Sequence, residues 1–208
     1  MHREVLIEPA ALLFPSLNRF PGFYLAGGTA LALQIGHRVS VDFDLFSDDV
    51  IDRALLPQVR RLFGTAAEIS PRVNNADELT VLVNGVKITF LRYPFPAREP
   101  FVIYENVPLL SVREIAATKA YTIGRRGSYK DYVDLYFVIA EGHATLLDIV
   151  ADAEHKFAAE FNGRLFLEQL VYLSDLDDTQ VQFIKPAVTP LDIQRFFEER
   201  IREVGDKV

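Results

Sequence analysis

The sequence predicts an α+β fold in which a mixed β-sheet flanked by helices is followed by a helical C-terminal half. Up to about residue 104, short apolar runs rich in Val, Ile, Phe and Tyr alternate with turn residues, which is typical of strands. After Pro108 the apolar residues recur with the period of a helix. The pair Asn84-Gly85 stands between two alternating runs and predicts an antiparallel hairpin. Strands therefore come first along the chain, and helices follow.

The first half is expected to contain strands over residues 22–27, 41–46, 78–83, 86–93 and 101–105. A helix over residues 29–35 should join the first two strands. A second helix is expected from residue 51 to residue 63, because its apolar residues recur at helical spacing and Gly64 follows as a stop signal.

The second half is expected to be helical throughout. Ser111, with Glu114 three residues later, forms a capping box that opens a helix to about Tyr121, and Gly124 and Gly127 then interrupt the pattern. Further helices are expected over residues 128–139, 144–160 and 163–173. A last helix should follow Thr189, because Thr is a good N-cap and the next residue is proline.

The length of 208 residues is enough for one domain with a sizeable core. We expect a core over residues 1–106 and a helical region over residues 107–208, which packs on it as a second domain or as part of one continuous domain. A net charge of −7 argues against a surface that holds nucleic acid by charge alone. The chain has no cysteine and no uncharged apolar run approaching ~20 residues, so we expect a cytoplasmic protein without a membrane segment.

A glycine pair and an Asp-x-Asp pair stand close together near the N-terminus. Gly27 and Gly28 lie where a strand turns into a helix, and such a helix N-terminus suits a phosphate group. Asp42 and Asp44 lie two apart on the next predicted strand, so their carboxylates share one face. Paired carboxylates suit Mg²⁺, which takes oxygen ligands and leaves places for substrate phosphates. Thr29 can add a hydroxyl donor. Each feature alone is also explained by a tight turn or a solvated strand face.

A second group of charged residues lies downstream. Lys119 stands in an alanine-rich helix, Arg125 and Arg126 follow in the predicted loop, and Lys130, Asp131 and Asp134 open the next helix. An ordinary i,i+4 ion pair of Lys130 with Asp134 is the structural alternative, but a lysine in the first turn opposes the helix dipole. Arg38 lies between the two halves of the first motif and is a candidate phosphate ligand. His37 beside it is more simply explained as a histidine whose hydrogen bonds are satisfied at a helix end.

Two segments, read in order, resemble a known family. "LAGGTALALQIGHRVSVDFDLFS" (residues 25–47) and "REIAATKAYTIGRRGSYKDYVDLYFVI" (residues 113–139) are similar to the nucleotidyl transferase AbiEii/AbiGii toxin family, a branch of the DNA-polymerase-beta-like nucleotidyltransferases. The likeness covers about residues 8 to 140.

The resemblance implies a nucleotidyltransferase core with a Mg²⁺-dependent site. In such a core the glycine pair and Thr29 hold the nucleoside triphosphate (NTP), and the two aspartates of the first motif bind Mg²⁺. The site is completed by four residues of the second motif, namely Lys119, Lys130, Asp131 and Asp134. Members of the family act as toxins of type IV toxin–antitoxin pairs or in phage defence. Some attach nucleotides to tRNA, and the partner is commonly a winged-helix antitoxin.

One position departs from the family pattern. Enzymes of this superfamily usually take a third carboxylate from a strand in the region where this chain has Lys87-Ile88-Thr89. Thr89 has no carboxylate, so we expect the helix that carries "KDYVDLY" to supply the missing acid. Asp131 and Asp134 are i,i+3 neighbours on one helix face, and Asp134 is the expected inward one because it shares a face with Lys130.

The sequence therefore predicts the transfer of a nucleoside monophosphate from an NTP to a hydroxyl acceptor such as tRNA. Mg²⁺ is the expected cofactor, with Asp42, Asp44, Asp131 and Asp134 as its ligands. The expected catalytic groups are Asp42, Asp44, Lys119 and Asp134, and the expected nucleotide contacts are Gly27, Gly28, Thr29, Arg38, Lys119 and Lys130. Two alternatives stay open at this point. One is a non-catalytic nucleotide-binding or partner-binding module with the same fold, and the other is a phosphotransferase.

Overall fold

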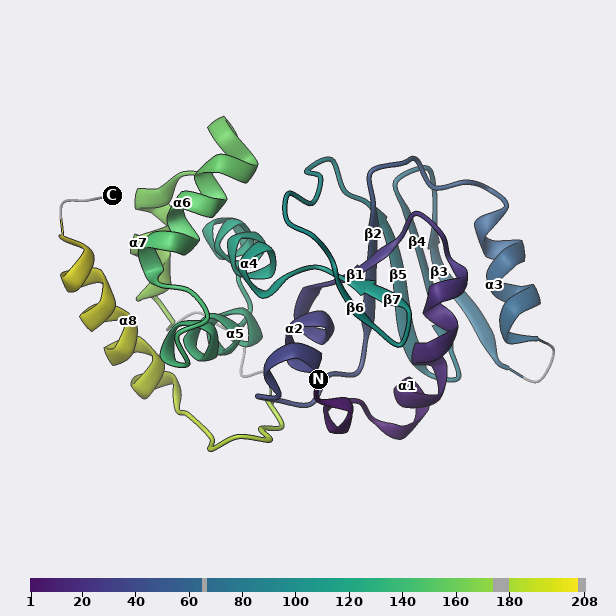
Figure 1. Ribbon diagram of the computed structural model, residues 1–208, viewed down its shortest axis with the longest axis horizontal. Coiled ribbons are helices and arrows are strands. Elements are labelled where there is room, and N and C mark those ends of the chain that lie inside the picture. The colour runs from purple at the N-terminus through teal and green to yellow at the C-terminus, as the bar shows by residue number, and fades with distance from the viewer. Residues whose placement is uncertain (65–66, 174–179, 206–208) are drawn as a thin grey trace.

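The computed structural model of the protein describes residues 1–64, 67–173 and 180–205, apart from the side chain of residue 126. Its centre is a mixed sheet in the order β3-β4-β5-β2-β1-β7-β6 (Figure 1). The strands are β1 (Tyr24–Ala26), β2 (Phe43–Ser47), β3 (Ile69–Asn74), β4 (Glu78–Val83), β5 (Val86–Arg92), β6 (Val102–Tyr104) and β7 (Val107–Leu109).

The strand β2 lies in the middle of the sheet and carries part of the Asp-x-Asp motif. It runs antiparallel to β1, with Ala26 opposite Asp44, and parallel to β5, with Asp44 beside Thr89. Strands β4 and β5 form the antiparallel hairpin predicted at Asn84-Gly85, and both turn residues have the positive φ that a tight hairpin turn requires.

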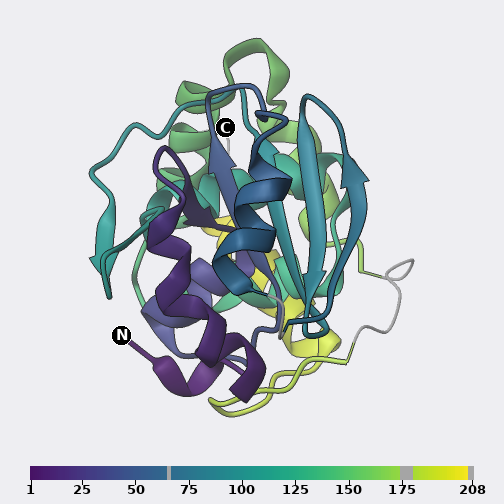
Figure 2. The same cartoon turned by 90° about the vertical axis from the view of Figure 1, so that its right-hand side faces the viewer.

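Helices cover both faces of the sheet. The helices α1 (Glu8–Leu13) and α3 (Leu55–Phe63) lie on one side, as Figures 1 and 2 show, and α2 (Gly27–Ile35) lies on the other with the helical half. That half contains α4 (Val112–Arg126), α5 (Tyr129–Ala140), α6 (Leu146–Phe157), α7 (Gly163–Leu170) and α8 (Pro190–Val204). Short 3-10 helices occupy Arg3–Val5, Phe14–Arg19 and Ala158–Glu160.

Alternation along the strands separates a buried face from a polar one. Phe43 and Leu45 of β2 and Phe90 of β5 are almost inaccessible to solvent and contribute to the core. Asp44 and Thr89 occupy the alternate positions and are only partly buried. The polar face is turned towards the helical half, so a polar cavity can form between the two.

The α+β class, a mixed sheet followed by a helical half, is confirmed. Several details differ from the sequence prediction. Strand β2 begins at Phe43, so Asp42 directly precedes it, and Gly124 lies inside α4 rather than ending it. The strands β3 and β7 and the helix α1 are found where no element was predicted. Because β7 still pairs with β1, the helical region begins at Val112.

Candidate active site

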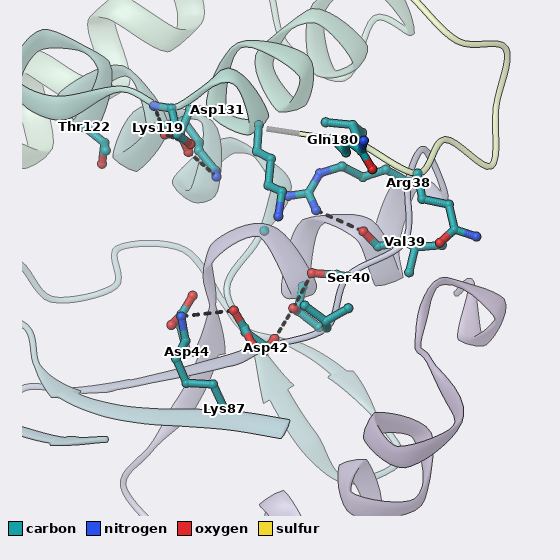
Figure 3. A pocket seen from close by; sticks show the side chains of 17 residues that line it. Arg38, Val39, Ser40, Asp42, Asp44, Lys87, Lys119, Thr122, Asp131 and Gln180 are labelled. Carbon is teal, nitrogen blue, oxygen red and sulfur yellow. Dashed lines mark hydrogen bonds and ion pairs between the residues drawn. The ribbon is translucent and has the colours of Figure 1, made fainter. Parts of the chain in front are cut away.

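A polar cavity of about 550 Å³ opens between the polar face of the sheet and the helical half. Its walls come from the N-terminal end of α2, the segment before β2, the strand β5, the helices α4 and α5, and a segment near residue 181 (Figure 3). Both predicted motifs therefore meet at one place, although their lining residues Asp44 and Lys119 are 75 positions apart in the sequence.

The two glycines of the first motif are required by close packing of the protein's own side chains. Gly27 has a φ of +66°, and a Cβ atom there would lie 2.7 Å from Oδ2 of Asp44. A Cβ atom at Gly28 would collide with the guanidinium group of Arg38 and lie 3.5 Å from Oδ2 of Asp134. The glycine pair thus lets a carboxylate and a guanidinium group approach the first turn of α2. The N-cap residue of α2, Ala26, makes no side-chain capping bond, so the first N–H groups of the helix can donate to an anion in the cavity.

Asp42 and Asp44 both line the cavity, as the first motif predicts. Lys87 of β5 places its Nζ 3.0 Å from Oδ2 of Asp42, and both side chains remain about two-fifths exposed. The hydroxyl group of Thr29 donates to the backbone oxygen of Asp42 and lies 2.7 Å from the hydroxyl oxygen of Ser40. Thr29 is buried, so its hydroxyl group holds the segment before β2 in place.

A buried ionic network centred on Asp134 forms the wall opposite Asp42. Arg38 donates from Nε to Oδ1 at 2.7 Å and from Nη2 to Oδ2 at 3.0 Å. His37 Nε2 lies 2.7 Å from Oδ1, and Lys119 Nζ lies 2.7 Å from Oδ2. Each carboxylate oxygen thus has two donors, and the side chain of Asp134 is completely buried. The network joins α5 to α4 and to the loop that leads into β2.

Asp131 links this network to the start of α5. Its Oδ1 lies 2.6 Å from Nζ of Lys119, and its Oδ2 accepts from the backbone N–H and the hydroxyl group of Ser128 at 2.9 Å each. Asp131 is thus the N3 residue of a capping box and the second carboxylate of Lys119. Two carboxylates, Asp131 and Asp134, and two cationic side chains, Lys119 and Arg38, thus balance one another in charge in the buried wall.

At Asp134 and Lys119, the neighbouring charges change the pKa more than burial does. Burial raises the pKa of Asp134, but the charges of Arg38 and Lys119 and the hydrogen bonds from His37 and Arg38 lower it more, so the pKa lies well below its usual value. Burial lowers the pKa of Lys119, and the charges of Asp134 and Asp131 raise it above the ordinary lysine value. Both groups are therefore charged at neutral pH.

His37 takes part in the network as a neutral ring. Burial lowers its pKa more than the hydrogen bond and charge of Asp134 raise it. Its Nδ1 atom is buried and has no hydrogen-bond partner, so a proton on that atom would leave a buried donor unsatisfied. We therefore assign the tautomer in which Nε2–H donates to Asp134. His37 follows α2 as the sequence predicts, but the expectation of a satisfied histidine holds for Nε2 and not for Nδ1.

The lysine side chains differ in how freely they can meet a ligand. Lys119 lines the cavity and keeps one of its three N–H donors after its two carboxylate contacts. Lys130 also lines the cavity, and no ion pair involves it within the described residues. Burial lowers the pKa of Lys87, but its contact with Asp42 and the charges of Asp44 and Glu78 raise it above the usual value.

The two arginines after Lys119 do not both bear on the cavity. Arg125 donates from Nη2 to the backbone oxygen of Glu160 at 2.7 Å and stacks over the ring of Tyr121, so it faces away from the site. The side chain of Arg126 lies outside the described residues.

A segment from the far end of the chain closes one side of the cavity. The backbone N–H of Val39 donates to the oxygen of Gln182 at 2.8 Å, and the N–H of Ile184 donates to the oxygen of His37 at 3.0 Å. Residues 180–182 consequently line the cavity, and Figure 3 shows Gln180 beside Arg38. Sequence reasoning missed this segment because pairing between distant loops leaves no local pattern. In the sequence Lys87 stands out only as part of the departure at Thr89, and no local pattern predicts its contact with Asp42.

The carboxylates present fit a magnesium ion that shares its ligands with a substrate. Within the described residues, three or more acidic or histidine side chains do not gather around a common metal position. Asp42 and Asp44 nevertheless line the cavity together, and Mg²⁺ usually takes only one or two carboxylates, with waters and substrate phosphates as its other ligands. Asp134 was expected as a further ligand, but it lies behind the cavity wall with both oxygens engaged.

The mixed sheet, the carboxylate pair before and on β2, and the lysine-rich cavity define the class of nucleotidyltransferase folds. Residues 14–207 match the family of the nucleotidyl transferase AbiEii toxin of type IV toxin–antitoxin systems. The chain belongs to this family.

Individual proteins resemble the chain over most of its length. An uncharacterized protein of Aquifex aeolicus is 28% identical over 192 residues, which cover 90% of each chain. A crystal structure from Helicobacter pylori has a TM-score of 0.62 at 17% identity and covers 97% of this chain and 99% of that chain. The nucleotidyltransferase toxin MenT4 of Mycobacterium tuberculosis has a TM-score of 0.57 at 17% identity, with 93% and 82% covered. These two structures share the fold.

Within residues 1–64, 67–173 and 180–205, no helix combines the length and the apolar character that a membrane span needs.

Proposed function

We propose that the protein transfers a nucleoside monophosphate from an NTP to a hydroxyl group of a macromolecular acceptor. The observation that carries the proposal is the meeting of Asp42, Asp44 and the uncapped N-terminus of α2 in a cavity that Lys119 and Lys130 also line. Carboxylates that hold a cation and donors that hold phosphates are the two requirements of phosphoryl chemistry.

The cofactor that fits this cavity is Mg²⁺, with Asp42 and Asp44 as its protein ligands. When bound, the ion neutralises charge on the transferring phosphate and favours ionisation of the attacking hydroxyl group. Lys87, which pairs with Asp42, is exposed enough to turn towards the phosphates.

The remaining residues bind and orient the nucleotide. In this proposal the first N–H groups of α2 and the ammonium group of Lys130 hold the leaving pyrophosphate. Arg38 keeps two N–H donors after its bonds to Asp134 and Val39, and these can reach a phosphate oxygen. Asp134 acts behind them, because it holds Arg38 and Lys119 at the cavity wall. This role replaces the metal contact expected for Asp134.

The biological setting follows from the family. We propose that the protein is the toxin of a type IV pair, that it acts in the cytoplasm on tRNA, and that a winged-helix antitoxin opposes it, with phage defence as the benefit to the host. Family membership supports a toxin that uses a nucleotide, and the choice of tRNA and of the antitoxin class rests on the resemblance of the two motifs.

Labelled nucleotides separate this function from its alternatives. The protein is incubated with Mg²⁺, total tRNA and each NTP labelled on either the α- or the γ-phosphate. Nucleotidyl transfer places the α label on the acceptor, whereas a phosphotransferase places the γ label there. Binding of NTP without either product indicates a non-catalytic module. The variants Asp42→Asn and Asp44→Asn should abolish transfer, and Asp49→Asn, an exposed aspartate beyond β2, should leave it unchanged.

A further inference from the structure

Two uncharged segments line one part of the active-site cavity. Residues 39–41 have the sequence Val-Ser-Val, and residues 180–182 have the sequence Gln-Val-Gln. The segments lie side by side, because the backbone N–H of Val39 donates to the backbone oxygen of Gln182 at 2.8 Å. This pairing brings the end of the chain to the loop that leads into β2, and the two segments together form an uncharged end of the cavity.

The charged residues of the cavity lie apart from this uncharged end. In Figure 3, Val39 and Gln180 lie on one side of the cavity, and Lys119, Asp131 and Asp44 lie on the other. The groups proposed above to hold the metal ion and most of those proposed to hold the phosphates thus occupy one part of the cavity, which leaves the uncharged end for another part of the substrate.

The uncharged end combines apolar side chains with unused amide groups. Val41 is 40% exposed, and Val39 and Val181 are partly accessible. Gln180 and Gln182 are both exposed, and no hydrogen bond involves either side-chain amide within the part of the chain that the structure describes. Each amide offers an acceptor oxygen and an NH₂ donor group. Apolar surface beside such groups suits a flat ring with hydrogen-bonding atoms on its edge, as in a nucleobase.

The size of the cavity and the order of its residues agree with this assignment. The volume of about 550 Å³ falls within the range of roughly 300–1,000 Å³ that is usual for pockets that enclose a small ligand. Val41 directly precedes Asp42 in the chain. A nucleotide whose α-phosphate lies beside Asp42 can therefore extend its sugar and base along residues 39–41, away from the groups that hold the leaving pyrophosphate.

We propose that the uncharged end holds the base of the NTP, and that Gln180 and Gln182 determine which base is accepted by hydrogen bonding to its edge. The two glutamines are then specificity-determining residues. A base whose donors and acceptors do not match the amides leaves polar groups unpaired, and that loss is the source of the selectivity. This proposal rests on the nucleotidyl transfer proposed above and deepens it by assigning the nucleobase subsite.

Equilibrium binding in the absence of an acceptor tests the subsite. The probes are the Mg²⁺ complexes of ATP, GTP, CTP, UTP and inorganic tripolyphosphate, which has no base. The wild-type protein should bind its preferred NTP about tenfold more tightly than the others, which corresponds to about one hydrogen bond. Gln180→Met and Gln182→Met keep the length of the side chain and remove its hydrogen-bonding groups. Each should weaken binding of the preferred NTP about tenfold and change the affinity for tripolyphosphate less than about twofold.

Three further variants separate the base from the phosphates. Val41→Ser should weaken all four NTPs about fivefold without affecting tripolyphosphate, because it removes apolar contact with any base. Lys130→Met should weaken the NTPs and tripolyphosphate alike. The matched control is Gln58→Met on α3, which lies on the other side of the sheet and should change none of these affinities.

The outcomes distinguish the subsite from the function on which it rests. Selectivity that is lost in the glutamine variants, with unchanged binding of tripolyphosphate, supports the proposal. Equal binding of the four NTPs by the wild type, or full selectivity in both variants, overturns it. An effect of the variants on the KM of the acceptor alone also overturns it, because the uncharged end would then hold the acceptor. Failure to transfer the α label overturns nucleotidyl transfer, whereas the binding measurements decide the base subsite separately.

Discussion

Arg38 and Asp134 form a two-point ion pair in which neither side chain is accessible by more than 4%. Arg38 belongs to the loop that leads to Asp42, and Asp134 belongs to α5 of the helical half. The pair therefore fixes the distance between the two halves of the cavity. Its members carry charge at neutral pH, because each raises the stability of the other's ionised form.

Asp134→Asn should be strongly destabilising. The substitution leaves the buried charges of Arg38 and Lys119 with only Asp131 as an acidic partner, and breaking a buried pair in this way costs about 3–5 kcal/mol. Urea unfolding measures the change. The matched control is Asp77→Asn, which breaks an exposed pair with Arg92 and should cost less than about 1 kcal/mol. Equal losses in the two variants would contradict the anchoring role of Asp134.

His37 should make the protein less stable in mild acid. Its pKa is lowered in the folded state, so below the unfolded value of about 6.5 the unfolded chain binds a proton that the folded chain does not. The free energy of unfolding should therefore fall as the pH drops below about 6.5, and continue to fall until the folded pKa is reached. His37→Gln, whose amide can donate to Asp134, should flatten this slope.

Unfolding titrations between pH 7.5 and pH 5, on the order of the window that an unperturbed histidine spans, measure the effect of His37. His143→Gln, at an exposed ring outside the buried network, is the control. NMR of the wild-type ring should show Nε2–H at neutral pH, and a protonated His37 under these conditions would refute the assignment.

Gly27→Ala should damage both stability and metal-dependent nucleotide binding. The new methyl group would need a positive φ, which costs roughly 1–2 kcal/mol, and it would displace the carboxylate of Asp44. Gly22→Ala is the matched control, since Gly22 also has a positive φ but open space around it. Gly22→Ala should lose a similar amount of stability and bind Mg²⁺-NTP normally in calorimetry. Normal binding by Gly27→Ala would remove Asp44 from the proposed metal site.

Lys130→Met should weaken nucleotide binding without affecting stability. Its ammonium group lines the cavity and has no ion-pair partner in the described part of the chain, so its charge is available to a phosphate. Loss of one charge-assisted hydrogen bond corresponds to about a tenfold weaker affinity. The deficit should shrink at high salt because the site is open to solvent. Arg125→Met, which changes a cation turned towards Glu160, is the control and should bind NTP like the wild type.

The sequence predicted those parts of the site that depend on local spacing. Strand alternation placed Asp42 and Asp44 together, and the Asn84-Gly85 turn produced the expected hairpin. The prediction at Gly124 was wrong, because one glycine costs a helix only about 1 kcal/mol and the packing of α4 outweighs that loss. Helix propensity alone could not predict that the packing of α4 outweighs the cost of Gly124.

Other features depend on contacts between residues that are far apart in the chain. The bonds between Arg38 and Asp134 span 96 residues, so no helical or strand periodicity in the sequence predicts them. Strand β3 escaped prediction because it contains Pro71, which is tolerated only at the edge position that β3 occupies. Strand β7 is three residues long around Pro108 and is recognisable only by its pairing with β1 and β6.

The contact of residues 182–184 with residues 37–39 joins segments that leave the ribosome at very different times. A growing chain can complete its sheet, with both aspartates of β2 and its preceding segment in place, long before Gln182 has been added. The cavity wall at residues 180–182 must wait for nearly the whole chain to emerge. A nascent toxin therefore carries its carboxylates through most of translation without an enclosed place for a nucleotide, and any toxicity begins only after synthesis has passed this segment.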